Sequence, residues 1–218
     1  MFAYLETDIG DVPSFQLEGE SDSVVCIFPA VFGIDDDIME LCSEINAQGH
    51  SVVAVDPFWE VDPGSLPHTI EGVRRALARK REISYEEQLI FAHACCSATQ
   101  VLAPINVALG ICFGGGMAFH AISQGLCSSA AIWHGAGLVK QIDSISSIDG
   151  RLHLHFGTED PLIPEVDREI LQELFRDNAK VHFWEYEGAK HGFTHRTGPS
   201  FDHDAWKDCT EKLFGLLH

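Results

Sequence analysis

Short apolar runs alternate with longer segments of helical periodicity along most of the chain. The runs at 24–28, 51–55 and 105–109 are mostly apolar, as expected of parallel strands that are covered on both faces. Between them, apolar residues recur at helical spacing, for example in 38–45 and 84–102. Strands that alternate with helices predict an α/β fold with a doubly wound, mainly parallel sheet flanked by helices.

The rest of the chain extends this pattern. The polar segment 1–23 predicts an edge strand or hairpin followed by a loop. Further strands are expected at 129–133, 152–156 and 181–186, and further helices around 166–175 and 206–216. No repeat, low-complexity tract or linker interrupts the sequence, which predicts one domain over residues 1–218.

Composition narrows the classes of partner. The net charge is −19, which argues against nucleic acid and anionic membrane surfaces as partners. No apolar run is long enough to span a membrane, and no signal peptide is visible. Seven scattered cysteines fit free thiols in a reducing compartment better than a disulfide framework. These observations predict a cytoplasmic protein. The expected partner is a small molecule, and the oligomeric state is expected to be a monomer or a small homo-oligomer.

The stretch from Gly110 to Gly116, Gly-Ile-Cys-Phe-Gly-Gly-Gly, lies between an expected strand and an expected helix. A strand, a Gly-Xaa-Cys-Xaa-Gly turn and a helix form a nucleophile elbow, with sulfur in place of the more usual serine oxygen. The elbow would hold the Cys112 thiol over a helix N-terminus, where the partial positive charge favours thiolate. Taken alone, the motif is also compatible with a Gly-rich turn around an inert cysteine.

Two further groups follow at the ends of later strands. Asp160 follows the strand at 152–156, and His191 follows the strand at 181–186. Reactive groups gather at the carboxyl ends of parallel strands. The order nucleophile, acid, base is that of α/β-hydrolases. A thiolate attacks a carbonyl carbon, an imidazole moves the proton, and a carboxylate orients the imidazole. The sequence thus predicts Cys112, Asp160 and His191 as catalytic residues.

Four segments together resemble the dienelactone hydrolase family, and the resemblance extends over nearly the whole chain. They are Gly110–Gly115, Gly157–Pro161, Gly188–Phe193 and Pro29–Gly33. The resemblance implies an α/β-hydrolase fold, a Cys-Asp-His triad, and neither metal nor organic cofactor. It also implies an oxyanion hole formed by the backbone N–H groups of Val31 and Phe113, a type of donor that contributes about 3 kcal/mol each to transition-state stabilisation.

Two positions depart from the family pattern. Ala30 stands where family members that act on dienelactone carry a glutamate beside the thiol, and His195 stands where they carry a substrate-binding arginine. Both departures point away from dienelactone as the substrate. Without the glutamate, we expect the resting site to favour a thiolate–imidazolium pair. The resulting hypothesis is a hydrolase of carboxylic esters or lactones that is not specific for dienelactone.

Several other residues have a structural and a functional interpretation. Phe32, Trp59, His134, Phe193 and His195 lie at or near strand carboxyl ends and are candidate substrate-binding residues, although ordinary packing explains each of the aromatic ones equally well. The same choice applies to three other groups, which are the acidic triplet 35–37, the basic segment 74–81 and the pair His153 and His155. For the acidic triplet, helix capping is favoured over a metal site. For the basic segment, a solvated helix face is favoured over a site for an acidic substrate. For the two histidines, a structural role is favoured over a metal site.

Two alternative functions remain open at this stage. A glutamine amidotransferase also uses a cysteine elbow, but its acid follows the histidine by two residues, where this chain has Phe193. A non-catalytic redox sensor or interaction protein on a hydrolase scaffold would retain a reactive Cys112. Loss of ester turnover on Cys112→Ala separates the enzyme from the sensor.

Overall fold

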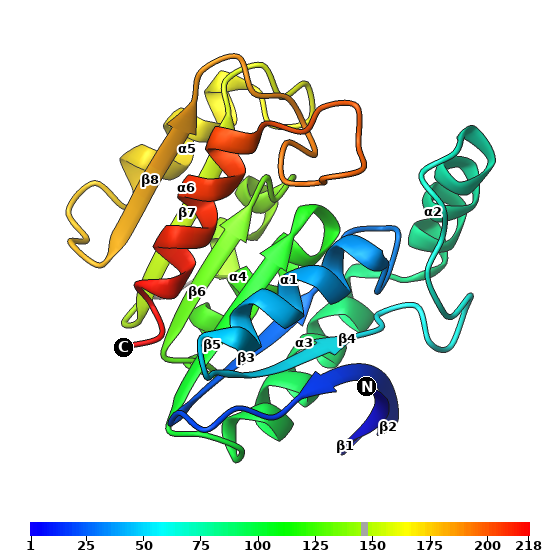
Figure 1. Ribbon diagram of the computed structural model, residues 1–218. Helices are drawn as coiled ribbons and strands as arrows, with labels where there is room; N and C mark the ends of the chain where they lie inside the picture. Colours follow the sequence, from blue (N-terminus) through cyan, green and yellow to red (C-terminus); the bar gives the residue numbers. More distant parts are fainter. Residues whose placement is uncertain (145–147) are drawn as a thin grey trace.

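The computed structural model describes residues 1–144 and 148–218 (Figure 1). Eight strands form one sheet in the order β1-β2-β4-β3-β5-β6-β7-β8. The strands are β1 Phe2–Thr7, β2 Gly10–Leu17, β3 Ser23–Phe28, β4 Ser51–Val55, β5 Ile105–Ile111, β6 Ser129–Trp133, β7 Arg151–Gly157 and β8 Val181–Tyr186. The helices are α1 Asp36–Ala47, α2 Ile70–Glu82, α3 Tyr85–Gln100, α4 Gly115–Ser123, α5 Glu165–Leu174 and α6 His203–Phe214, with short 3-10 helices η1 Cys112–Gly114 and η2 Leu138–Ser144.

The direction of the strands agrees with the sequence pattern. From β4 to β8 all neighbouring strands pair in parallel, whereas β1, β2 and β4 pair antiparallel. The edge hairpin expected in 1–23 is therefore confirmed. Parallel strands align their carboxyl ends at one edge of the sheet, so the loops after β3, β5, β6, β7 and β8 emerge together.

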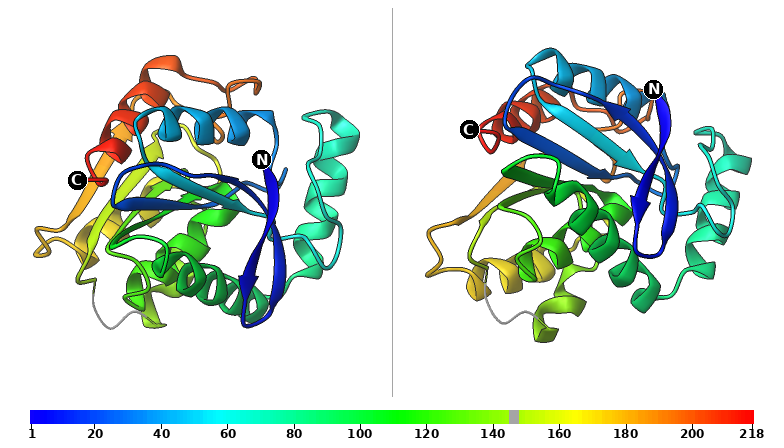
Figure 2. Two further views of the ribbon diagram at one scale, coloured as in Figure 1. Left: turned by 60° about the horizontal axis from the view of Figure 1, so that its bottom comes forward. Right: turned by 90° about the horizontal axis from the view of Figure 1, so that it is seen from below.

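Two apolar cores sandwich the sheet. Consecutive residues of a strand face opposite sides, and alternate residues of β3 and β5 accordingly contribute to different cores. Helices α3, α4 and α5 pack on one face, and α1 and α6 pack on the other (Figures 1 and 2). This arrangement, with helices on both faces of a mostly parallel sheet, is the predicted α/β-hydrolase type of fold.

Helix α2 differs from the others because it stands at the side of the molecule, apart from the helices that cover the sheet (Figure 2). Its buried residues are Gly72, Ala76 and Arg79, while Ile70, Val73 and Leu77 are exposed. Residues at this spacing form a stripe along the helix. Among the described residues, no helix is long and apolar enough to cross a membrane.

Candidate active site

Cys112 sits on a tight turn at the carboxyl end of β5. Its φ angle is 53°, in the left-handed region that a side chain seldom adopts and that occurs at strained functional turns. Gly110 and Gly114 leave the room for this turn, since a Cβ on Gly114 would lie 2.0 Å from the Phe28 carbonyl oxygen and one on Gly110 2.5 Å from the Gly114 oxygen. The glycines of the sequence motif therefore have the steric role that an elbow requires.

Asp160 and His191 meet Cys112 from two neighbouring loops. The His191 Nδ1 atom lies 2.8 Å from Asp160 Oδ2, and its Nε2 atom lies 3.1 Å from Cys112 Sγ. Asp160 is buried, and its other oxygen accepts a hydrogen bond of 2.8 Å from the Leu162 N–H. The carboxylate is thus fixed on one side by the backbone and on the other by the imidazole, and the structure brings all three predicted catalytic residues into one hydrogen-bonded line.

The two ring nitrogens of His191 face the Asp160 carboxylate and the Cys112 sulfur, and these two contacts determine the pKa of the imidazole. Burial alone would lower the pKa of His191, but its hydrogen bonds to Asp160 and to Cys112 outweigh that effect and raise the pKa to about 10. At neutral pH the arrangement therefore favours an imidazolium ion beside the sulfur. This charge is what a resting thiolate–imidazolium pair requires.

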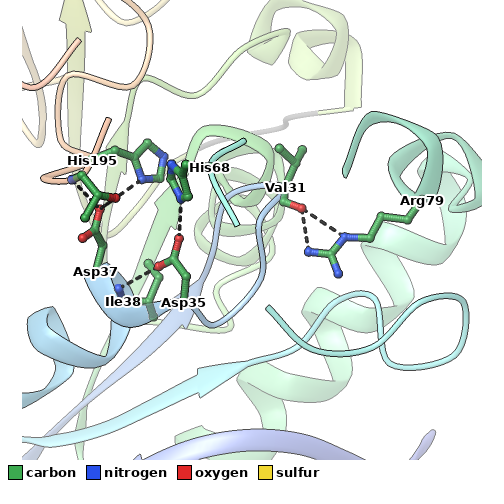
Figure 3. Close-up of polar contacts among 8 residues, drawn as sticks. Val31, Asp35, Asp37, Ile38, His68, Arg79 and His195 are labelled. Carbon is green, nitrogen blue, oxygen red and sulfur yellow. Dashed lines mark hydrogen bonds and ion pairs between the residues drawn. The ribbon is translucent and has the colours of Figure 1, made fainter. Parts of the chain in front are cut away.

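The loop after β3 places Val31 next to Cys112 on the wall of the same cavity. Among the described residues, the Val31 N–H has no hydrogen-bond acceptor, so it is available to a ligand. Its carbonyl oxygen accepts two hydrogen bonds from Arg79, from Nε at 3.1 Å and from a terminal nitrogen at 2.7 Å (Figure 3). Phe113, the other predicted oxyanion-hole residue, follows Cys112 directly and is buried.

Arg79, which the sequence placed only in the basic segment 74–81, has a role at this site that was not predicted. Its guanidinium also donates to the carbonyl oxygens of Asp62 and Gly64, at 2.8 and 2.7 Å, and it stacks on Phe58. It therefore ties α2 to the Val31 loop. Its position with Gly72 and Ala76 on the buried side of α2 is a helical spacing that could have shown it as a core residue rather than as part of a solvated face.

The rest of the basic segment is largely engaged. Arg74 pairs with Glu71, and Arg75 pairs with Asp62. These exposed pairs are worth little in stability, and they leave the solvated-face interpretation intact for the outer side of α2. Over the described residues, Lys80 and Arg81 form no ion pair, and Lys80 borders the cavities at Cys112 with its ammonium group 5.7 Å from the centre of the Phe113 ring.

Two cavities meet at Cys112. The first, here called the apolar cavity, has a volume of about 540 Å³ and includes Val31, Phe32, Leu162, His191, His195 and the exposed stripe of α2 in its lining. The second cavity has a volume of about 450 Å³ and includes Phe113, Lys140, Gln141 and Asp167. Cys112, Lys80 and Leu162 border both, so the nucleophile candidate lies where the cavities join.

Only two of the five expected substrate-binding residues line these cavities, namely Phe32 and His195. Trp59 instead borders a separate hollow with Ile9 and Phe91. His134 and Phe193 are fully buried behind the site. The ring of His134 packs edge-on against His191, with centroids 5.0 Å apart, and Nε2 lies 2.7 Å from Thr194 Oγ1. Trp59, His134 and Phe193 are therefore not placed for direct contact with a substrate at Cys112, because their loops turn the rings into the core or away from Cys112.

A second polar cluster consists of Asp35, His68 and His195 (Figure 3), and its two histidines line the apolar cavity. His68 Nε2 lies 2.8 Å from Asp35 Oδ2, while Asp35 Oδ1 caps α1 by accepting the Ile38 N–H at 3.0 Å. The capping expected of the acidic triplet is therefore confirmed. His195 packs against His68, and burial is the main cause that lowers the pKa of His195 to about 4, so this imidazole is neutral at pH 7.

Two groups of side chains have the donor types of a metal site, with ligand atoms within 4.8 Å of one another. They are Cys112, His134 and His191, and Asp35, His68 and His195. In the first group, Cys112 and His191 already interact with each other in the hydrogen-bonded line. In the second group, Asp35 already caps α1. The pair His153 and His155 belongs to neither group among the described residues. His155 Nδ1 lies 2.8 Å from the Tyr186 hydroxyl, and its ring stacks on Trp184, which is the structural role expected of it.

Comparisons with known proteins identify the family of this chain. The sequence model of the dienelactone hydrolase family matches residues 15–218. Carboxymethylenebutenolidase 1 of Cupriavidus pinatubonensis is 27% identical over 203 residues, which cover 91% of this chain and 86% of that protein. Carboxymethylenebutenolidase of Pseudomonas putida is 25% identical over 199 residues, covering 89% and 84% of the two chains.

Solved structures extend the likeness of the fold. A dienelactone hydrolase-like promiscuous phosphotriesterase from metagenomic libraries superposes with a TM-score of 0.75 at 18% identity, covering 100% of this chain and 97% of that one. A cold-adapted esterase from an Arctic intertidal metagenomic library gives a TM-score of 0.72 at 14% identity, with 100% and 93% coverage.

Proposed function

The chain belongs to the dienelactone hydrolase family, and we propose that it hydrolyses carboxylic esters or lactones through a thioester on Cys112, with His191 as acid–base and Asp160 as its orienting carboxylate. That it is an ester or lactone hydrolase follows from the family and its named relatives. The residues and the thioester are the proposal. The observation that carries it is the line Asp160–His191–Cys112, with contacts of 2.8 and 3.1 Å, ending at the junction of two cavities.

The first half of the reaction forms the thioester. The Cys112 thiolate attacks the carbonyl carbon, and the Val31 and Phe113 N–H groups receive the developing oxyanion. The intermediate collapses as the carbon–oxygen bond to the alcohol breaks. His191, which enters this step protonated, gives its proton to the departing oxygen.

The second half restores the enzyme. Neutral His191 takes a proton from water, and the hydroxide adds to the thioester carbon. Collapse breaks the carbon–sulfur bond and releases the acid and the Cys112 thiolate. Asp160 stays ionised throughout and stabilises the imidazolium each time it forms.

Mass spectrometry during turnover of a short chromogenic ester tests the assignment. We expect an acyl adduct on Cys112 and on none of the other six cysteines, all of which are buried. Cys112→Ala should abolish both adduct and turnover, while Cys42→Ala, which also removes a single thiol, should retain them. An adduct elsewhere, or full activity of Cys112→Ala, would overturn the role of Cys112. Reversible oxidation of Cys112 in a protein that turns over no ester would instead favour the redox-sensor alternative.

The proposal also covers location, partners, domain organisation and oligomeric state. Free thiols at all seven cysteines support a reducing, cytoplasmic location. A protein that acts alone on a small molecule needs neither nucleic acid nor membrane, and we propose one domain over residues 1–218, as a monomer or a small homo-oligomer. Sedimentation and cell fractionation test these points.

A further inference from the structure

The two cavities that meet at Cys112 differ in which catalytic group they contain. His191 and Gly192 line the apolar cavity. Over the described residues, the lining of the second cavity does not include His191 but includes Lys140 and Asp167. An ester bound at Cys112 extends to both sides of its carbonyl carbon, and the two cavities that border Cys112 offer separate spaces for its acyl and alcohol parts.

The apolar cavity owes its character to α2. Ile70, Val73 and Leu77 line it, yet they are 93%, 41% and 45% exposed. A helix face of large apolar side chains is seldom left to water without a function. Phe32 and Leu162 continue the apolar lining close to Cys112. The cavity therefore offers contact to hydrocarbon along most of its length.

Most of the cationic side chains near this cavity are already engaged by other groups of the protein. Arg79 is bound to three carbonyl oxygens. Arg196 pairs with Glu40 at 2.9 Å and Glu44 at 2.6 Å and lies over Trp206. His191 is held by Asp160 and Cys112, and His68 lies 2.8 Å from Asp35. His195 is neutral at pH 7, and Lys80 lies at the border shared by both cavities.

The position of His191 orients the ester. To receive a proton from Nε2, the departing oxygen must come within about 3 Å of that atom. We propose that the apolar cavity binds the alcohol side of the ester, and that this side is an uncharged aliphatic or aromatic group. The inference rests on the proposed function, and it places the acyl side in the second cavity, near Lys80 and Lys140.

Two series of esters test the orientation. In alkyl acetates from ethyl to hexyl, the alcohol lengthens while the carbonyl group stays the same; in methyl esters from acetate to hexanoate, the acyl chain lengthens. We expect kcat/KM to rise by up to about fourfold per methylene in the alcohol series and by clearly less in the acyl series. The reverse order would overturn the orientation. A wild-type protein that hydrolyses none of these esters would instead overturn the proposed function.

Variants on α2 locate the effect. Leu77→Asp changes an exposed position, so folding should be retained, and it places a carboxylate in the apolar cavity. We expect it to flatten the alcohol series and to leave the trend of the acyl series. Val101→Asp, at an exposed apolar position at the end of α3, is the matched control and should keep both series. If kcat/KM rose equally with alcohol length in Leu77→Asp and Val101→Asp, the role of α2 in binding the alcohol side would be contradicted.

A third measurement needs no turnover. If the alcohol side occupies the cavity, 1-hexanol should slow iodoacetamide labelling of Cys112 more strongly than hexanoate does, and Leu77→Asp should remove that protection. Failure of 1-hexanol to protect would overturn the subsite even in an active esterase. Protection in an inactive protein would keep the subsite while the catalytic proposal fails.

Discussion

His191 and His195 lie four positions apart in the loop after β8, and both face the apolar cavity. Both are largely buried, and both have carboxylates nearby. Yet the pKa of His191 is raised to about 10, whereas that of His195 is lowered to about 4. One loop therefore delivers a charged and a neutral imidazole to the same cavity.

Contact distance explains the difference. His191 Nδ1 lies 2.8 Å from Asp160 Oδ2, and its Nε2 atom reaches the sulfur at 3.1 Å. His195 Nδ1 lies 4.0 Å from Asp37, beyond hydrogen-bond reach. Burial penalises the charged form of both rings, and only direct hydrogen bonds overcome that penalty. A carboxylate in the neighbourhood is therefore insufficient to make a histidine a catalytic base.

Removing the contact of His191 is expected to have the largest effect. Asp160→Asn should keep the fold but reduce kcat by about 10³- to 10⁴-fold, because the amide can select the wrong imidazole tautomer. The matched change, Asp37→Asn beside His195, should reduce kcat by less than about tenfold. Steady-state kinetics on a chromogenic ester, with circular dichroism to check folding, gives both values. Near-normal turnover of Asp160→Asn would assign the orienting role to another carboxylate, such as Glu159.

The role of His191 was much easier to predict from the sequence than the charge of His195. Cys112, Asp160 and His191 were predicted because each follows a clearly patterned strand, the carboxyl ends of parallel strands lie at one edge of the sheet, and the order of the three residues is informative. His195 was placed at the site through the family pattern, but its neutral charge depends on a separation of 4.0 Å from Asp37. Distances of this kind depend on loop paths, which no periodicity encodes.

The elements themselves were predictable for a similar reason. Buried runs such as 105–109 and stripes such as that of α1 carry their period in the sequence, and the structure has β5 and α1 there. The side-chain positions of Trp59, His134 and Phe193 were less predictable, because a residue after a strand can turn toward the cavity or into the core. The stripe of α2 was hidden by the arginines interleaved with it at 74, 75 and 79.

Arg79 extends the comparison to a buried cation that is held by carbonyls instead of a carboxylate. Burial lowers its pKa, although Asp56 and Asp62 oppose this. Arg79→Lys keeps the charge, but one ammonium group cannot reach the carbonyls of Val31, Asp62 and Gly64 together. We expect kcat to fall by about 10- to 100-fold as the Val31 N–H loses its position.

The matched control for Arg79 is Arg75→Lys, which alters the exposed pair with Asp62 on the same helix. It should change kcat by less than about twofold. Thermal unfolding of both variants separates loss of the site from loss of the fold. Equal kcat values for the two variants would contradict the role of Arg79 in holding the Val31 loop.

Adding a carboxylate near His191 sharpens the comparison further. Ala30 lines the apolar cavity with Cys112 and His191, so Ala30→Glu introduces a negative charge beside the sulfur, which disfavours thiolate. In the wild type we expect fast iodoacetamide labelling of Cys112 even at pH 6, where a free thiol of pKa about 8.5 is almost fully protonated. Ala30→Glu should slow labelling at pH 6 by about tenfold.

A carboxylate in the second cavity is the control for that change. Ala136 borders Cys112 there, on the side that does not contain His191, and Ala136→Glu should slow the labelling less than Ala30→Glu does. Wild-type labelling that rises only above pH 8 would contradict a resting thiolate–imidazolium pair.

The smallest expected effect is the contribution of neutral His195 to the free energy of unfolding. Because the pKa of His195 is about 4 in the folded protein and about 6.5 when unfolded, only the unfolded chain takes up a proton between these values. The free energy of unfolding should therefore fall as the pH drops below 6.5, by about 1 kcal/mol at pH 5.5 for this residue. His191, with its raised pKa, has the opposite sign: its contribution is complete below pH 6.5 and is lost as the pH rises toward 10.

Urea unfolding at pH 7.5 and pH 5.5 measures the loss. His134 and His155, whose pKa values are also lowered by burial, add to it in the wild type, so His195 is isolated by substitution. His195→Asn, which has no titrating group, should lose about 1 kcal/mol less than the wild type between the two pH values. The same loss in both proteins would mean that His195 is protonated in the folded state and that the charges of Asp35 and Asp37 are sufficient to hold its proton. Direct hydrogen bonding would then not be what distinguishes His191 from His195.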